Sequence, residues 1–378
     1  MSLSSLRFEP AQKPWRRSLG FGPIAVDYPL LITLLIVAGI GLVVLYSAVG
    51  ESGGAMLRQG IRLGAGLAAF FALAQVPPRY FRVWTPWLYV GVLGLLLVVM
   101  LAGEIGGGAR RWLDLGFVSF QPSELMKLAV PMMVAWYLHE RTLPPRLGHL
   151  LVVTLIVAVP ALLIAKQPDL GTALLIVAAG GLTILLAGIS LKIMAGGLLA
   201  ALIAAPIVWQ FFMLDYQRAR VLTFLDPSRD PGGSGWNIIQ SQIAIGSGGT
   251  FGKGWLNGTQ AHLDFLPEPS TDFIFALMGE ELGLLGLATL LVLYLVLVGR
   301  GLYIAVEAQD TFTRLLAGSL SLTFFFYVFV NAGMVSGLLP VVGVPLPLVS
   351  AGGTSMVTLL AGFGMLAAIS RHRKLLAP

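Results

Sequence analysis

Long apolar runs decide what this chain can fold into. Ten of them, separated by short polar connections, approach the roughly 20 residues that a helix needs to cross a lipid bilayer. We expect spans at about Pro29–Ala48, Ile61–Val76, Pro86–Ala102, Pro122–Leu138, Leu147–Ala165, Leu170–Ala187, Leu191–Leu214, Asp272–Val298, Phe312–Val335 and Ser350–Ile369. The prediction is an all-α polytopic membrane protein of about ten transmembrane helices, with no soluble catalytic domain.

The composition agrees with a membrane protein. Only 11% of the residues are charged and 57% are hydrophobic, whereas soluble domains average about 25% charged residues. The first run has the length of a span and no small-residue cleavage site follows it, so we interpret it as a retained helix. Cysteine is absent, which excludes disulfides and thiol catalysis.

The distribution of positive charge predicts the orientation. Ten spans place both termini on one side, and most Lys and Arg residues lie in short connections there, among them Arg17, Arg79 and Arg141. The positive-inside rule makes that side cytoplasmic. We therefore expect a cytoplasmic segment over residues 1–27, one transmembrane domain over 28–370 and a cytoplasmic tail over 371–378.

One outer connection, about residues 215–271 between the seventh and eighth spans, is much longer than the others. Structureless loops of this length are uncommon unless they are functional, so we expect a partly ordered lid with a short helix over Asn237–Gly249, closed by glycine. The stretch "GSGGTFGKG" lacks the spacing of a phosphate-binding loop. We expect neither a nucleotide nor a nucleic-acid partner.

Several cations fall in the outer loops or at the outer ends of the spans. One interpretation is ordinary solvated loop charge. The other is an anionic ligand at the outer surface, because arginine forks match phosphate oxygens bidentately. A lipid-linked phosphate or pyrophosphate would lie at that depth. The candidates to bind it are Arg58, Arg111, Lys127, Arg218, Arg220 and Lys253.

The fourth span begins with "QPSELMK", residues 121–127. Pro122 suits the first helical position, and Glu124 and Lys127 then fall at i,i+3 on one helix face. They either form a self-neutralising ion pair or line the polar wall of a cavity, and ionisable groups within spans favour the second interpretation. The turn "KQPD" before the sixth span suggests that Asp169 caps that helix.

A carboxylate, Asp272, stands where the eighth span begins. It can be a cap in the first helical turn or a general base that meets a headgroup at the membrane surface, and the residues alone leave these alternatives about even. Glu280 is about 12 Å further along the axis, too far for the carboxyl pair of a retaining glycosidase. We expect Glu280 and Glu281 to bond to neighbouring helices or backbone.

The same stretches resemble one family. "RRWLDLG", "FQPSELMKL", "KQPDLGTALL", "GWNIIQSQIAIGSGG", "NGTQAHLDFLPEPSTDF" and "GVPLPLVS" are similar to the SEDS proteins (shape, elongation, division and sporulation), and more to their cell-elongation than their cell-division branch. The resemblance implies a ten-helix peptidoglycan glycosyltransferase of the bacterial cytoplasmic membrane, acting on lipid II and the nascent glycan strand. Its implied partners are a class B penicillin-binding protein and other membrane proteins of the elongation complex.

The resemblance also implies site residues. The family's essential acidic residue falls on Asp272, its "PSE..K" motif on residues 122–127, and its arginines on Arg111 and Arg58. With these we group Gln121 and Ser123 as substrate-binding. One departure is Ala351, where the family usually has an aromatic residue, so a packing or substrate role of that position is in doubt here.

Three hypotheses follow. In the first, Asp272 deprotonates the acceptor sugar of a glycosyl transfer and the outer cations bind pyrophosphate. A divalent cation could assist, although the sequence has no dedicated ligand cluster. The second is a flippase that moves lipid II across the bilayer, and the third is a non-catalytic scaffold of the elongation machinery. Polar groups that gather near the outer face favour the enzyme over both.

Overall fold

The computed structural model describes residues 26–106, 109–114, 119–230, 232–263, 265–266 and 268–372. The predicted terminal segments 1–27 and 371–378 lie almost wholly outside these residues. Within them, a long helix occurs at the position of each predicted span. The helices are α1 (Tyr28–Ala48), α2 (Gly53–Ala74), α3 (Pro78–Ala102), α4 (Pro122–Leu138), α5 (Leu147–Lys166), α6 (Leu170–Leu186), α7 (Leu191–Ile207), α11 (Ile274–Val306), α12 (Thr311–Val335) and α13 (Thr354–Arg371).

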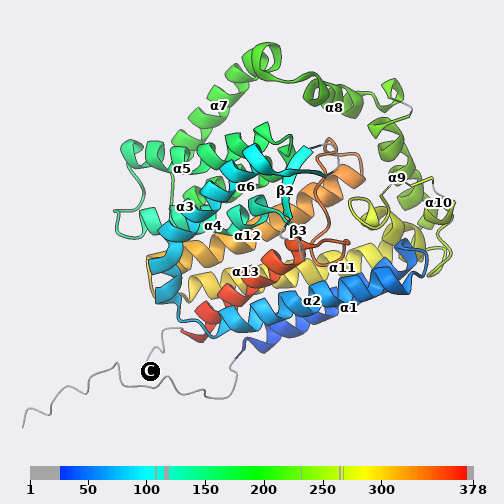
Figure 1. Ribbon diagram of the computed structural model, residues 1–378, viewed down its shortest axis with the longest axis horizontal. Coiled ribbons are helices and arrows are strands. Elements are labelled where there is room, and N and C mark those ends of the chain that lie inside the picture. Colours follow the sequence, from blue (N-terminus) through cyan, green and yellow to red (C-terminus); the bar gives the residue numbers. More distant parts are fainter. Residues whose placement is uncertain are drawn as a thin grey trace, which may run out of the picture.

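These helices form a multi-pass membrane bundle (Figure 1). In the described part of the chain, seven helices are long and apolar enough to cross a membrane. The other three are α4 and α6, of 17 residues each, and α2, which carries Arg58 and Arg62. Seventeen residues span about 25 Å, less than a typical hydrocarbon core. The all-α fold is confirmed, and ten is an approximate count of spans.

Two predicted helix starts were wrong. Helix α2 begins at Gly53 rather than Ile61, with the Ser52 hydroxyl accepting from the Ala55 N–H at 3.4 Å. Helix α3 begins at Pro78 rather than Pro86, which lies inside the helix. In both cases the first turns carry arginines, so a search for apolar runs begins too late.

The centre of the bundle is formed by α12 and α13. Helix α12 packs against α11, α6 and α4, and α13 packs against α2. The aromatic rings of Tyr294, Phe324 and Phe363 connect α11, α12 and α13 in edge contacts, with centroids 5.5 and 5.0 Å apart. A side chain at Gly364 of α13 would collide with the backbone of Phe70 in α2. Such small residues allow close helix approach within membranes.

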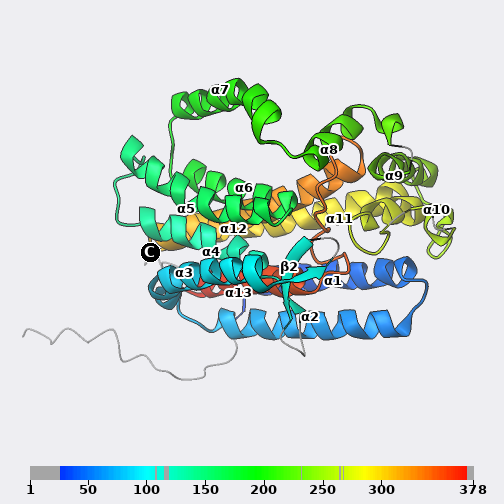
Figure 2. The ribbon, with the colours of Figure 1, turned by 45° about the horizontal axis from the view of Figure 1, so that its top comes forward.

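A small antiparallel sheet follows α3, in the order β1-β2-β3. Its strands are β1 (Glu104–Gly106), β2 (Ala109–Asp114) and β3 (Ser119–Phe120). The segment between α12 and α13 passes beside it in both views (Figures 1 and 2). This sheet was not predicted from the sequence, because β1 and β3 have only three and two residues and the six-residue β2, "ARRWLD", shows no alternation of apolar and polar residues.

The long connection between α7 and α11 is ordered into short helices. They are the π-helix η2 (Val208–Phe212), α8 (Asp215–Leu225), the 3-10 helix η3 (Pro227–Arg229), α9 (Ser234–Gly248) and α10 (Thr259–His262). The predicted helix at Asn237–Gly249 is confirmed as α9. In both views α7 and α8 stand apart from the bundle, whereas α9 and α10 lie at one end of α11 (Figure 2).

Helix α11 is broken at Gly283, whose φ of 65° lies in the left-handed region. The segment 249–254 satisfies the backbone groups that the break releases. Leu284 N–H donates to the Gly249 carbonyl at 2.9 Å, and Lys253 N–H donates to the Glu280 carbonyl, also at 2.9 Å. Glycine suits this position because it adopts positive φ without a Cβ clash. The break fixes the long connection to α11.

Candidate active site

Asp272 lies immediately before α11 rather than in its first turn. The helix begins at Ile274, and its N-cap, Phe273, makes no side-chain cap hydrogen bond; among the described residues, no hydrogen bond is among the causes that shift the pKa of the Asp272 carboxyl. The helix-cap alternative for Asp272 is therefore wrong. The position of the Asp272 carboxylate therefore needs an explanation other than helix capping.

Two neighbouring elements hold the backbone around Asp272. Asn331 of α12 donates from Nδ2 to the carbonyl of Asp272 at 3.0 Å and to that of Val344 at 2.7 Å. Ser350 donates its hydroxyl to the Thr271 carbonyl at 2.5 Å. The Ala351 N–H donates to the Ser270 carbonyl at 2.8 Å. The segment before α11 is thus tied to α12 and to the loop that precedes α13.

The electrostatic environment of Asp272 suits a base. Burial is the main cause that raises the pKa of this carboxyl from 3.8 to about 6, the negative charge of Glu268 adds to the rise, and Arg220 opposes it. A Cβ at Gly343 would lie 3.6 Å from Asp272 Oδ2, so no side chain from that position covers the carboxylate. A general base works best when its pKa is close to the operating pH.

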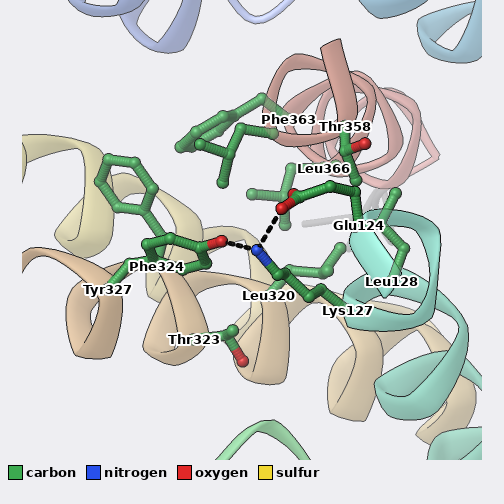
Figure 3. A pocket seen from close by; sticks show the side chains of 12 residues that line it. Glu124, Lys127, Leu128, Leu320, Thr323, Phe324, Tyr327, Thr358, Phe363 and Leu366 are labelled. Carbon is green, nitrogen blue, oxygen red and sulfur yellow. Dashed lines mark hydrogen bonds and ion pairs between the residues drawn. The ribbon is translucent and has the colours of Figure 1, made fainter. Parts of the chain in front are cut away.

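The ion pair of the fourth helix, the alternative that the sequence favoured less, is present inside the bundle (Figure 3). Lys127 Nζ lies 2.7 Å from Glu124 Oε1. Lys127 also donates to the Tyr327 hydroxyl, and its ammonium lies 4.7 Å from the centre of that ring. The adjoining cavity of about 40 Å³ is lined mostly by apolar side chains such as Phe324 and Phe363. It has room for water but not for a sugar ring.

Helix α12 brings this ion pair and Asp272 to a common face. Tyr327 contacts Lys127, and Asn331 holds Asp272. Residues four apart lie on the same side of a helix, about 6 Å along its axis. The two motifs that the sequence analysis singled out therefore converge through α12.

A second polar network adjoins them. Gln121 Nε2 donates to Ser123 Oγ at 2.8 Å and to Asp169 Oδ2 at 3.0 Å. Asp169 caps α6 as predicted, accepting from the Thr172 N–H at 3.1 Å. Arg111 of β2 donates to the carbonyls of Gln167 and Pro168, at 3.2 and 2.6 Å. Arg111, Gln121 and Ser123 are thus assembled on the turn that precedes α6.

This second network also borders the loop that faces Asp272. A Cβ at Gly171 in the first turn of α6 would collide with the Val342 carbonyl. The next residue, Gly343, faces the Asp272 carboxylate. The turn before α6 and the segment before α11 therefore lie on either side of one loop.

The other predicted cations are distributed differently. Arg220 is close enough to lower the pKa of Asp272. Arg218 donates from Nε and Nη2 to the carbonyls of Trp209 and Gln210, both at 3.0 Å. Lys253 pairs with Glu280 at 2.6 Å, and Arg58 is exposed on α2. A substrate role for these last three stays a prediction.

Glu280 and Glu281 bond to neighbouring segments, as expected. Thr259 donates its hydroxyl to Glu280 Oε1 at 2.9 Å, and the Gln260 N–H donates to the same carboxylate at 3.1 Å. Ser47 of α1 donates to Glu281 Oε1 at 2.5 Å. These carboxylates anchor the long connection and α1 to the first turns of α11.

Two residues of this site were not among the predicted site residues. Arg62 of α2 is half-buried beside Gly353, where a Cβ would lie 3.9 Å from its Nε. Its neighbour Gln59 donates from Nε2 to the Ser350 carbonyl at 3.2 Å. The spacing of Gln59, Arg62, Gly66 and Phe70 on one helix face was a usable signal. Asn331 was the other, since a polar residue within an apolar span is a functional candidate.

For a divalent cation, which the sequence left open without a dedicated ligand cluster, the described chain likewise has no such cluster. No group of three or more His, Asp or Glu side chains there could hold a metal ion. Glu268 lies close enough to Asp272 for its negative charge to raise the pKa of that carboxyl.

Fold and site together define a multi-pass membrane protein in which a carboxylate of raised pKa, Asp272, lies just before the broken helix α11. The family model of the cell cycle proteins FtsW, RodA and SpoVE matches residues 28–375. The peptidoglycan glycosyltransferase MrdB of Escherichia coli K12 is 50% identical over 356 residues, which cover 94% of this chain and 96% of MrdB. Stage V sporulation protein E of Bacillus subtilis is 35% identical over 92% of this chain and 98% of its own length. The chain belongs to the SEDS family.

Solved structures agree with this assignment. A chain from a structure of a peptidoglycan synthase complex, on the coordination of polymerization and crosslinking, is similar at a TM-score of 0.83 and 32% identity. It covers 93% of this chain and 99% of that one. Thermus thermophilus RodA is similar at a TM-score of 0.71 and 28% identity, over 93% of this chain and 98% of that one.

Proposed function

We propose that the chain is a peptidoglycan glycosyltransferase that polymerises lipid II in cell elongation and rod-shape maintenance. The names of its relatives support this activity: MrdB and, as a probable assignment, FtsW of Geobacter metallireducens are peptidoglycan glycosyltransferases. The membership in the SEDS family and the likeness to a chain of a peptidoglycan synthase complex support it as well.

In the proposed reaction, the Asp272 carboxylate takes the proton from the C4 hydroxyl of an acceptor GlcNAc. The oxygen forms a bond to C1 of the donor MurNAc from the opposite side. The bond between C1 and undecaprenyl pyrophosphate breaks, and the pyrophosphate leaves with the electron pair. The configuration at C1 is inverted, and one proton has moved from the acceptor to Asp272.

The observation that carries the proposal is the placement of Asp272. Its side chain is not used as a helix cap, its backbone is fixed by Asn331, and its pKa is raised to about 6, mainly by burial. Such a carboxylate is a better base than an exposed aspartate and is still largely ionised at neutral pH. A residue with only a structural role would not need this environment.

Cations would stabilise the leaving pyrophosphate without an acid. Arg220, beside Asp272, and Arg62, beside the start of α13, are nearest to that task. We propose that substrate binding also involves Arg58, Arg111, Arg218, Lys127 and Lys253, together with Gln121, Ser123 and Glu124, of which Glu124 holds Lys127. We also propose that a divalent cation assists, so that a metal chelator should lower polymerisation.

The location and partners complete the proposal. One transmembrane domain over residues 28–370 would lie in the cytoplasmic membrane with both termini inside, which puts Asp272 at the outer face. A class B penicillin-binding protein would supply the crosslinking, alongside other membrane proteins of the elongation complex. The similar synthase complex, in which polymerization and crosslinking are coordinated, supports such a partner.

The test gives lipid II to the purified chain with its cognate class B partner, whose transpeptidase is blocked. We expect glycan polymer, and in liposomes no faster transfer of lipid II between leaflets than in protein-free vesicles. Transfer without polymer would instead identify a flippase. Absence of both activities would leave a scaffold and overturn the proposal.

A further inference from the structure

A pocket of about 320 Å³ lies at the end of the bundle opposite Asp272. It is formed where α1 begins and α13 ends, which lie together in Figure 1. Its lining residues are Val26, Asp27, Tyr28, Pro29, Arg300, Ala367, Ser370 and Arg371. Helix α13 begins close to the segment before α11, since the Ala351 N–H donates to the Ser270 carbonyl, and its last residues line the pocket. Its 18 residues span about 27 Å, close to the thickness of the bilayer core, so the pocket opens toward the other membrane surface.

The polar wall of this pocket carries net positive charge. Asp27 accepts from Arg300 Nε at 2.9 Å, from Arg300 Nη2 at 2.7 Å and from the Ser370 hydroxyl at 2.6 Å. The pair of Asp27 and Arg300 is therefore neutral and well bonded. Arg371 adds a further cation. Its exposed side chain donates from Nη1 to Gln75 Oε1 at 2.9 Å.

The remaining wall is apolar. Val26, Pro29 and Ala367 contribute it, and Tyr28, which is 65% exposed, stands at the rim. Aromatic residues concentrate at the depth of lipid headgroups. A soluble anion would gain nothing from this wall, whereas a phospholipid offers a phosphate to the arginines and a glycerol backbone to the apolar side.

We propose that this pocket binds the headgroup of an anionic phospholipid in the leaflet opposite the catalytic site. Arg371 and the exposed part of Arg300 contact the phosphate, with the charge-assisted geometry that guanidinium groups offer. Basic pockets between transmembrane helices bind anionic headgroups in this way. The volume also falls in the range of ligand pockets. The lipid would connect the ends of α1, α11 and α13.

The experiment titrates the purified full chain with phosphatidylglycerol or phosphatidylcholine and counts bound lipid by native mass spectrometry. We expect tighter binding of phosphatidylglycerol. Arg371→Gln should weaken it about tenfold and leave phosphatidylcholine unchanged. Arg371→Lys keeps the charge but not the fork, and should fall between. The matched control is Arg314→Gln, which removes an exposed arginine of α12 near the same membrane surface but outside the pocket; we expect less than a twofold change.

Three outcomes would overturn the proposal. Equal effects of Arg371→Gln and Arg314→Gln on lipid binding would mean that general surface charge, rather than the pocket, attracts the lipid. Equal binding of both lipids would mean that the pocket does not select the net negative charge of an anionic phospholipid, since both lipids carry a phosphate. A rise in melting temperature with inorganic phosphate that equals the rise with phosphatidylglycerol would assign the pocket to a free anion. Because binding is measured without lipid II, a failure here leaves the proposed catalytic activity untouched.

Discussion

Asn331 of α12 holds Asp272 in place through the backbone rather than the side chain. Its Nδ2 donates to the Asp272 carbonyl at 3.0 Å and to the Val344 carbonyl at 2.7 Å. Asn331 is fully buried, and a buried amide that bridges two segments fixes their relative position. The carboxylate of Asp272 thereby stays available for chemistry.

Replacing Asn331 by Leu should lower activity by misplacing Asp272. Two buried carbonyls would lose their donor, which costs about 1–3 kcal/mol each in such settings. We expect a lower melting temperature and a fall in kcat of at least about tenfold with little change in KM. Thr323→Val is the matched control, since the Thr323 hydroxyl is buried on the same helix without a hydrogen-bond partner in the described chain. Equal melting temperatures and equal kcat values for Asn331→Leu and Thr323→Val would contradict a positioning role of Asn331.

The pH dependence of polymerisation should report the pKa of Asp272. The base must be ionised, so kcat/KM should fall as pH drops through about 6. Glu268→Gln removes a negative charge that raises this pKa and should move the acid limb to lower pH. Arg220→Gln removes a positive charge that lowers it and should move the limb to higher pH. An acid limb that neither substitution moves would argue against Asp272 as the titrating group.

The ion pair of Glu124 and Lys127 should matter most when only one partner is removed. Both side chains are buried, and an unpaired charge in such a site costs about 3–5 kcal/mol. Lys127→Met should therefore lower the melting temperature more than the double variant Glu124→Gln with Lys127→Met. A thermal melt of the three proteins checks this. If the double variant has the lowest melting temperature of the three proteins, the ion pair itself stabilises the fold and the prediction is contradicted.

The break in α11 should tolerate no side chain at Gly283. A Cβ there would collide with the backbone of Gly252, and the positive φ adds strain of about 1–2 kcal/mol. Gly283→Ala should loosen the long connection, which increased proteolysis near residues 249–254 would reveal. Gly299→Ala is the control in the same helix, because a Cβ there meets nothing within 4 Å. Identical cleavage of both variants would contradict the strain.

The helices were predictable because apolar runs of this length have few alternatives. The starts of α2 and α3 were not, since Arg58, Arg62 and Arg79 lie in turns that packing, rather than hydropathy, keeps helical. In the small sheet, β1 and β3 are too short to show a pattern, and the six-residue β2 does not alternate apolar and polar residues. The break in α11 was not predictable, because its only sign in the sequence is Gly283 and isolated glycines are common in spans.

Site residues were predictable where their type is unusual within an apolar span. They were not predictable where only the distance between side chains identifies them. Asp272, Glu124 and Lys127 are ionisable groups in apolar surroundings, so the sequence marks them. That Arg220 reaches Asp272 while Arg218 contacts the end of η2 depends on which face of α8 each occupies. Arg62 lies one turn from Arg58 and faces α13. Which of the two arginines faces the bundle is decided by helix packing alone.

The most direct test of this account compares polymer formation by Asp272→Asn and Glu268→Gln. The folded pKa of Asp272 is raised above 3.8, so its ionised form destabilises the fold above about pH 6, and this penalty disappears as the pH falls through 6 toward 4. Asp272→Asn should therefore melt at least as high as the wild type at pH 8. It should form no polymer from lipid II, whereas Glu268→Gln should retain it. Polymer at wild-type levels from a well-folded Asp272→Asn would contradict the account.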